Sequence, residues 1–124
     1  LLVIFGEFEV PEKVLGKRGD AELKRGRSIL QPDTTRSTRK CYLTGRTDNL
    51  QLHHCFPGKN RKISDEYGFW VYLTADLHNG NDPAAVHNNP NNGYDLLLKQ
   101  LCQRAYEEAN SRDNFIALIG RSYL

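Results

Sequence analysis

The sequence has few cysteines and no long apolar run, and these shortages exclude several classes of protein. Its three cysteines (Cys41, Cys55 and Cys102) form no C-x-x-C pair, so we expect no disulfide framework and a reducing, intracellular setting. They also lack the paired spacing of a closed structural zinc site, which needs four ligands. The longest apolar stretch, residues 1–5, is too short to cross a membrane or to form a signal-peptide core.

The charge is small overall but unevenly distributed. The 124 residues carry a net charge of +2 and have the composition of one ordinary soluble domain. Residues 13–40 hold nine basic and three acidic side chains, whereas residues 41–124 hold eight basic and nine acidic ones. A basic segment of this kind suits a polyanionic partner such as nucleic acid. A solvated face with a mobile arm accounts for the same charges equally well.

Local patterns predict strands first and helices later. Alternating, β-branched or aromatic residues predict strands over residues 1–10, 41–43, 50–56 and 69–73. Of these, 41–43 and 50–56 form a hairpin around a turn at 45–49. Residues 13–28 predict a loop or arm, residues 31–40 a linker, and the basic stretch 57–64 a further loop.

The second half of the sequence has helical periodicity. Apolar residues at helical spacing predict an amphipathic helix over residues 94–110 and a shorter helix over 113–119, which Gly120 closes. Residues 74–78 predict a helix start, with Thr74 at the N-cap and Asp76 in the first turn. Cys102, inside the long helix, is expected to be a small core residue.

All of the histidines lie in one stretch of the sequence. They are His53, His54, His78 and His87, and the basic residues Lys59, Arg61 and Lys62 lie among them. The adjacent pair ends an alternating run, and successive side chains of a strand point to opposite faces. One imidazole can therefore face a metal while its neighbour faces a substrate. This clustering predicts a metal-dependent hydrolytic site, although any one of these histidines alone would more often be structural.

Several blocks in this stretch resemble those of a known family. They are Leu52-His53-His54, the run from Val71 to His78, and Val86-His87. These blocks resemble the HNH nuclease family, whose site is a β-hairpin and a helix around one divalent ion, the ββα-metal motif. Gly58, Arg61-Lys62, Tyr67-Gly68 and the stretch 94–124 are similar to small HNH-like proteins of phages and prophages. The resemblance begins at residue 41 and leaves residues 1–40 unexplained.

The resemblance implies a fold and a set of roles. It implies a small α+β domain over residues 41–124, with a ββα-metal core and C-terminal helices. The N-terminal strand and basic arm over 1–40 are predicted from local pattern and charge alone. His53 and His78 would bind one divalent ion (Mg²⁺, Mn²⁺, Zn²⁺ or Ni²⁺). His87 would be a third ligand or a phosphate contact, although a surface loop position suits it equally. His54 would be the general base that activates water.

Basic residues would hold the DNA beside this site. Arg61 is expected to assist catalysis by clasping phosphate with two hydrogen bonds. The further candidates for nucleic-acid contact are Lys59, Lys62, Arg36, Arg39 and Lys40.

The sequence also departs from the family pattern. Thr44, Thr74 and Leu77 occupy places where many relatives carry zinc-binding cysteines, and only Cys41 remains. We therefore expect no structural zinc. The central asparagine that braces the loop after the base has no equivalent near residues 68–69, and Asn60 is the alternative brace.

Three functions are consistent with these observations. The first is a metal-dependent DNA endonuclease encoded by a phage or prophage and acting in the bacterial cytoplasm, with no membrane partner. Cleavage of both strands would favour a homodimer. The second is a catalytically inactive HNH-like module that binds nucleic acid, which the missing asparagine and missing cysteines favour. The third is a partner-binding domain that uses the histidines for a regulatory metal.

Overall fold

A two-stranded antiparallel ribbon lies at the centre of the protein in the computed structural model, which describes residues 25–124. Its strands are β1 (Leu50–His54) and β2 (Trp70–Thr74). In the register of the ribbon, His53 lies opposite Val71 and His54 lies opposite Trp70. Because side chains alternate between the two faces of a strand, each histidine shares a face with its cross-strand partner.

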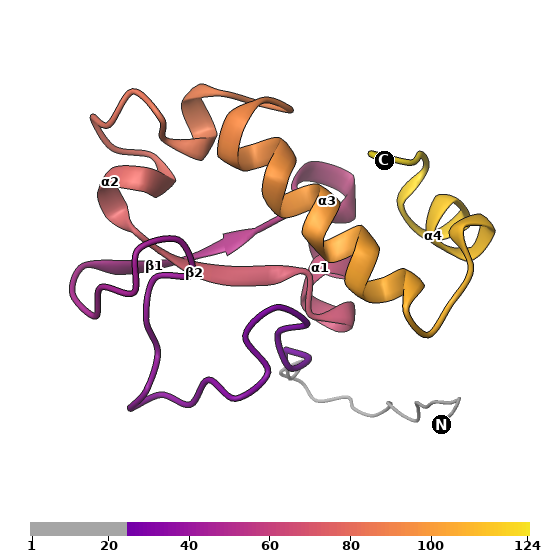
Figure 1. Cartoon of the computed structure of the whole chain (residues 1–124), viewed down its shortest axis with the longest axis horizontal. Helices are drawn as coiled ribbons and strands as arrows, with labels where there is room; N and C mark the ends of the chain where they lie inside the picture. The colour runs from indigo at the N-terminus through magenta and orange to yellow at the C-terminus, as the bar shows by residue number, and fades with distance from the viewer. Residues whose placement is uncertain (1–24) are drawn as a thin grey trace.

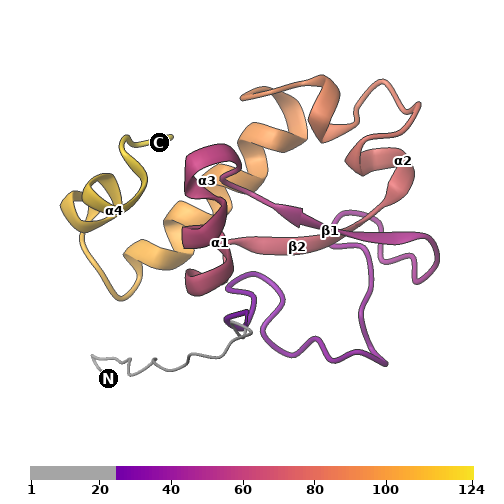
Figure 2. The same cartoon turned by 180° about the vertical axis from the view of Figure 1, so that it is seen from behind.

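Helices surround the ribbon. Within the described residues they are α1 (Arg61–Tyr67), α2 (Ala75–His78), α3 (Gly93–Glu107) and α4 (Arg112–Ile119), with 3₁₀ turns η2 (Gly58–Asn60) and η3 (Val86–Asn88). The long helix α3 and the segment 25–45 lie on opposite sides of the ribbon (Figures 1 and 2). The prediction of a small α+β fold is confirmed. No helix among residues 25–124 is long and apolar enough to cross a bilayer.

The core forms between the ribbon and the C-terminal helices. Val71 and Leu73 of β2 are fully buried, as are Leu98 and Cys102 of α3. Aromatic rings extend this cluster toward α4. The side chain of Phe56 meets Phe69 and Phe115 edge-on, with ring centroids 5.3 and 5.6 Å away, a favoured aromatic geometry. The prediction of Cys102 as a core residue is confirmed.

The predicted hairpin between residues 41–43 and 50–56 is wrong. Residues 42–44 form a turn, closed by hydrogen bonds from Gly45 N to Cys41 O (2.8 Å) and from Cys41 N to Arg46 O (2.7 Å). Gly45 has φ of +80°, a conformation that glycine adopts at low cost. β1 pairs instead with β2, the strand predicted over 69–73. Local alternation indicated a strand at 50–56, but it carried no information about its partner.

The predicted basic loop over residues 57–64 is also wrong, because η2 and α1 occupy it. The helix is held to the segment that follows β1 by Ser64, whose hydroxyl donates to Phe56 O (2.9 Å) and accepts from Phe56 N (3.3 Å). It ends at Gly68, which has φ of +77°. A Cβ at Gly68 would lie 1.9 Å from the carbonyl oxygen of Arg27, so only glycine fits there. These stabilising contacts come from distant residues and leave no periodic signal in the sequence.

The other helices follow the prediction. Thr74 precedes α2 in extended conformation, and Asp76 lies in the first turn. The predicted helices over 94–110 and 113–119 correspond to α3 and α4. Ser111 caps α4 by accepting a hydrogen bond from Asn114 N (3.0 Å), and Gly120, with φ of +112°, ends that helix.

The segment after residue 24 runs along the outer edge of β2. Ile29 N donates to Gly68 O (2.8 Å). The Gln31 side chain accepts from Tyr72 N (2.9 Å) and donates to Lys40 O (2.8 Å), while Tyr42 N donates to Tyr72 O (2.9 Å). The strand predicted over residues 1–10 and most of the arm predicted over 13–28 lie outside the described residues.

Candidate metal centre

Three of the four histidines converge on the face of the ribbon that carries His53. His53 lies on β1, His78 ends α2 and His87 lies in η3. One ring nitrogen from each histidine lies within 4.8 Å of the others. The centroid of the His53 ring is 5.3 Å from that of His78 and 5.9 Å from that of His87. The fold therefore brings together the three residues that the sequence predicted as metal ligands.

The His53 ring has unmet hydrogen-bonding capacity. The residue is 3% exposed, and both of its ring nitrogens are buried without a hydrogen-bond partner. Leaving a buried polar group unsatisfied costs about 1–3 kcal/mol. A divalent ion between the three imidazoles would use a nitrogen of His53 that no protein group satisfies among the described residues. The donor set thus fits a metal that prefers imidazole, such as Zn²⁺ or Ni²⁺.

The His78 ring is oriented by a neighbour on β1. Its Nδ1–H donates to Gln51 Oε1 (2.7 Å), so the neutral ring keeps a lone pair on Nε2. That nitrogen lies 3.0 Å from Nε2 of His87. Two imidazoles on one ion lie about 3–3.4 Å apart when metal–nitrogen bonds are about 2.0–2.1 Å. The His78–His87 spacing matches this geometry. A hydrogen bond between the two rings would also explain it, but would leave His53 unpartnered.

Burial keeps two of these imidazoles neutral. It lowers the pKa of His53 to about 3 and that of His78 to about 4, and the charge of neighbouring histidines acts in the same direction. Both rings are therefore unprotonated at pH 7, which is the form that binds a metal. Exposure increases from buried His53 through half-buried His78 to exposed His87. The cluster is consequently open to solvent at His87.

The low pKa of His53 gives an expected pH dependence of stability for the metal-free protein. Between about pH 6.5 and 3 the unfolded chain binds a proton at this residue that the folded chain does not. Stability should be constant above pH 6.5 and should fall below it, by about 1.4 kcal/mol per pH unit from this group alone. Urea unfolding in EDTA at pH 7.5, 6 and 5 measures this. An unchanged free energy of unfolding between pH 7.5 and 5 would contradict it.

Gln51 gives a second prediction, because partners that orient a ligating histidine strengthen metal binding. Gln51→Leu removes the acceptor for His78 Nδ1–H and should weaken metal affinity about 10- to 100-fold. Gln51→Glu keeps an acceptor and should bind at least as tightly as the wild type. Competition with a chromogenic chelator provides the measurement. Equal affinities for the leucine and glutamate variants would show that Gln51 does not orient the ligand.

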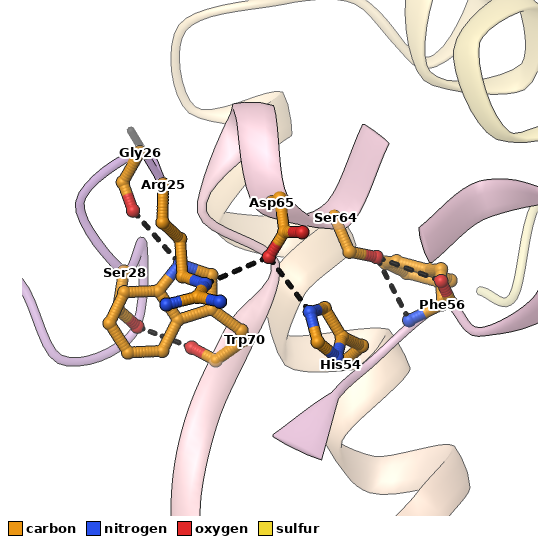
Figure 3. A network of polar contacts seen from close by, with 8 residues as sticks. All are labelled: Arg25, Gly26, Ser28, His54, Phe56, Ser64, Asp65 and Trp70. Carbon is orange, nitrogen blue, oxygen red and sulfur yellow. Dashed lines mark hydrogen bonds and ion pairs between the residues drawn. The ribbon is translucent and has the colours of Figure 1, made fainter. Parts of the chain in front are cut away.

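His54 lies on the other face of β1 and contacts a residue that sequence reasoning missed. Its Nε2 lies 2.8 Å from Oδ1 of Asp65, which also accepts from Arg25 Nε at 2.8 Å (Figure 3). The Arg25 and His54 hydrogen bonds lower the pKa of the Asp65 carboxyl, outweighing the effect of its partial burial. Asp65 lies on α1, a helix that the sequence did not predict, so no spacing in the sequence indicated this contact.

The basic residues predicted to contact phosphate occupy two exposed surfaces. Lys59, Arg61 and Lys62 are exposed on η2 and the first turn of α1, directly after β1. None of these three forms an ion pair within the described residues. Arg61 precedes Asp65 by four residues, so the two share a helix face. This spacing brings Arg61 to the side of α1 that carries the contact with His54.

The second basic surface lies on the face of the ribbon that carries His54. Arg36, Arg39 and Lys40 are exposed. The guanidinium of Arg39 lies 5.7 Å from the centroid of the Tyr72 ring, and Tyr72 shares the His54 face.

Asn60 contacts a different element from the one predicted. Its side chain donates to Ile119 O (2.9 Å) at the end of α4. It therefore attaches the segment after β1 to the C-terminal helix, and its contact with Ile119 does not orient the His54 ring.

The positions that the predicted resemblance aligned with zinc-binding cysteines are occupied as follows. Burial raises the pKa of the Cys41 thiol, but hydrogen bonds with the Thr44 side chain and the backbone of Thr74, Thr44 and Leu43 outweigh it and lower the pKa. Leu77 belongs to the hydrophobic core. Cys41 is thus satisfied by hydrogen bonds, and packing holds this corner of the fold.

No protein-family model matches the sequence, and neither curated proteins nor solved structures give a match.

Proposed function

We propose that this protein is a metal-dependent endonuclease of the HNH type that hydrolyses phosphodiester bonds in DNA. The observation that carries the proposal is the convergence of His53, His78 and His87, with both nitrogens of His53 buried and unpartnered. β1 and β2 pair antiparallel and α2 follows β2, which is compatible with the ββα-metal motif, and the helix α1 is an addition between the two strands. In this proposal β1 and α2 each supply a ligand.

The three histidines would hold one divalent ion and leave coordination positions open toward solvent. Three protein ligands with an open position are typical of catalytic rather than structural sites. When bound, the ion supplies polarisation of a phosphoryl oxygen and stabilisation of the leaving oxygen. His87, the exposed member, marks the side from which a phosphate approaches.

His54 would accept the proton of the attacking water. It follows His53 directly but faces the other side of the ribbon. Groups on both faces can reach one phosphate only at an edge of the strand, and β1 carries no further strand on its other edge within residues 25–124. We therefore place the scissile phosphate beside the open edge of β1.

The basic side chains fit the same placement. Arg61 and its neighbours Lys59 and Lys62 follow β1 and are exposed without an ion-pair partner among the described residues. Arg61 would hold the phosphate adjacent to the scissile bond, because a guanidinium clasps phosphate with two hydrogen bonds. Arg36, Arg39 and Lys40 would contact the backbone farther along the DNA.

A second candidate function is binding of nucleic acid without cleavage. The position of His54 on the opposite face from the three ligands favours it, because a base must reach the same phosphate as the ion. In that case the ion would hold η3 against the ribbon, and the basic surfaces alone would bind the nucleic acid.

Incubation of the protein with supercoiled plasmid separates the candidates. With Mg²⁺, Mn²⁺, Zn²⁺ or Ni²⁺, an endonuclease produces nicked or linear DNA, and EDTA stops the reaction. A binding module instead slows the migration of the plasmid in a gel in a salt-sensitive manner, and it does not cleave the plasmid with any of these ions. Neither cleavage nor binding would exclude both candidates and would favour a regulatory metal site.

A further inference from the structure

Two donors meet at one oxygen of Asp65. His54 Nε2 and Arg25 Nε each lie 2.8 Å from Oδ1. Dashed lines mark both contacts in Figure 3. His54 is 14% and Asp65 28% exposed at the side chain, so the contact is mostly protected from water. A hydrogen bond that is partly shielded from solvent holds its geometry better than an exposed one. The arrangement therefore restrains the imidazole rather than merely touching it.

The chemistry of the carboxylate determines where the His54 proton lies. An ionised carboxylate only accepts hydrogen bonds, so Nε2 of His54 must carry the hydrogen that points at Asp65. A neutral imidazole has one N–H, which leaves Nδ1 with a free lone pair. No described residue donates a hydrogen bond to Nδ1. This is the nitrogen that can take a proton from water.

Asp65 is itself held in place by the segment before the ribbon. Gly26 N donates to the carbonyl oxygen of Asp65 (2.7 Å), and the indole N–H of Trp70 donates to Gly26 O (2.9 Å). A Cβ at Gly26 would lie 2.5 Å from Glu66 O, so the close approach requires glycine. Arg25 is thereby positioned on Asp65, with its guanidinium 5.8 Å from the centroid of the Trp70 ring. Trp70 lies opposite His54 in the ribbon.

From this geometry we infer that Asp65, supported by Arg25, is the positioning residue that fixes His54 with Nε2 protonated and Nδ1 free to accept a proton. The inference rests on the proposed function for its catalytic consequence, whereas the orientation of the ring is a property of the protein itself. It also supplies the brace for the base that the sequence lacks in its expected place.

The orientation is tested without reference to activity. Long-range ¹H–¹⁵N correlation spectra of ¹⁵N-histidine-labelled protein, with and without Zn²⁺, distinguish a protonated from a bare ring nitrogen. In the wild type we expect His54 to have Nε2 protonated and Nδ1 bare. Asp65→Asn should produce a mixture of tautomers, because an amide can either accept from or donate to the ring. Asp48→Asn, which removes another arginine-paired carboxylate (2.7 Å from Arg46), should leave the spectrum unchanged.

Kinetics test the catalytic consequence. Asp65→Asn should lower kcat for plasmid cleavage by at least about 10-fold and at most the about 10⁴-fold seen when a histidine-orienting carboxylate is replaced in serine proteases. KM and metal affinity should change little, and Asp65→Glu should restore part of kcat. Unaltered tautomers and unaltered kcat in Asp65→Asn would overturn the inference. If the wild type cleaves no DNA, the proposed function fails, and the spectra still decide the role of Asp65 in orienting His54.

Discussion

Replacing His53 by leucine is expected to have two effects of opposite sign on stability. In the presence of Zn²⁺ or Ni²⁺, the variant should lose the stabilisation that the ion gives the wild type, because ligands that bind only the folded state raise its free energy of unfolding. In EDTA, the variant should be more stable than the wild type by about 1–3 kcal/mol. This gain arises because leucine removes two buried nitrogens that have no partner.

Chemical unfolding with and without metal measures both effects in one experiment. His54→Leu is the matched control, because it changes the adjacent histidine on the opposite face of β1 and should leave the metal effect intact. His78→Ala should also abolish the stabilisation by metal. It should not raise the free energy of unfolding in EDTA, since Nδ1 of His78 has a hydrogen-bond partner in Gln51. Retention of metal stabilisation by both ligand variants would refute the three-histidine site.

Replacing His54 by alanine is expected to have the largest effect on activity. General base catalysis contributes about 10²- to 10⁴-fold to rate, so His54→Ala should reduce plasmid cleavage by that factor. Metal affinity should be retained, because His54 does not belong to the cluster of potential ligands. DNA binding should be retained as well, because the basic surfaces on α1 and the segment 25–45 are unchanged.

The assay compares single-turnover cleavage rates at saturating metal. Arg61→Ala tests the contact with phosphate. It should weaken DNA binding, make that binding less dependent on salt, and lower the cleavage rate. His87→Ala distinguishes the two roles considered for that exposed residue. If His87 is a ligand, the variant should bind metal more weakly; if it contacts phosphate, only the cleavage rate should fall. Equal cleavage by His54→Ala and wild type would exclude His54 as the base.

The sequence predicted those parts of the fold that depend on local patterns. The period of apolar residues located α3 and α4, and glycine at position 120 located the end of α4 correctly. Clustering of the histidines in one stretch predicted the candidate site, because β1, α2 and η3 all belong to this stretch and bring one histidine each to the same place. His53 ends an alternating strand pattern, and His78 ends the helix that follows β2 without a break.

The parts that were missed depend on contacts between distant residues. α1 is short and charged. It is stabilised by the hydrogen bond from the Ser64 hydroxyl to Phe56 O and by the close packing of the Arg27 backbone against Gly68. Since α1 was not predicted, the contact between Asp65 and His54 could not be predicted from the spacing of these residues in the sequence. The pairing of β1 with β2 was missed for the same reason, because the intervening residues resembled a loop.

Gln31 also affects how the protein behaves at high concentration. Its amide acts as a peptide group, accepting from Tyr72 N and donating to Lys40 O at the outer edge of β2. Exposed strand edges with unpaired backbone groups are templates for self-association and aggregation. With both backbone groups of Tyr72 occupied, and the Trp70 carbonyl accepting from Ser28, a second molecule cannot add a strand along this edge. Gln31, Tyr42 and Ser28 together thus occupy this edge as an additional strand would, and they protect the ribbon from growth on that side.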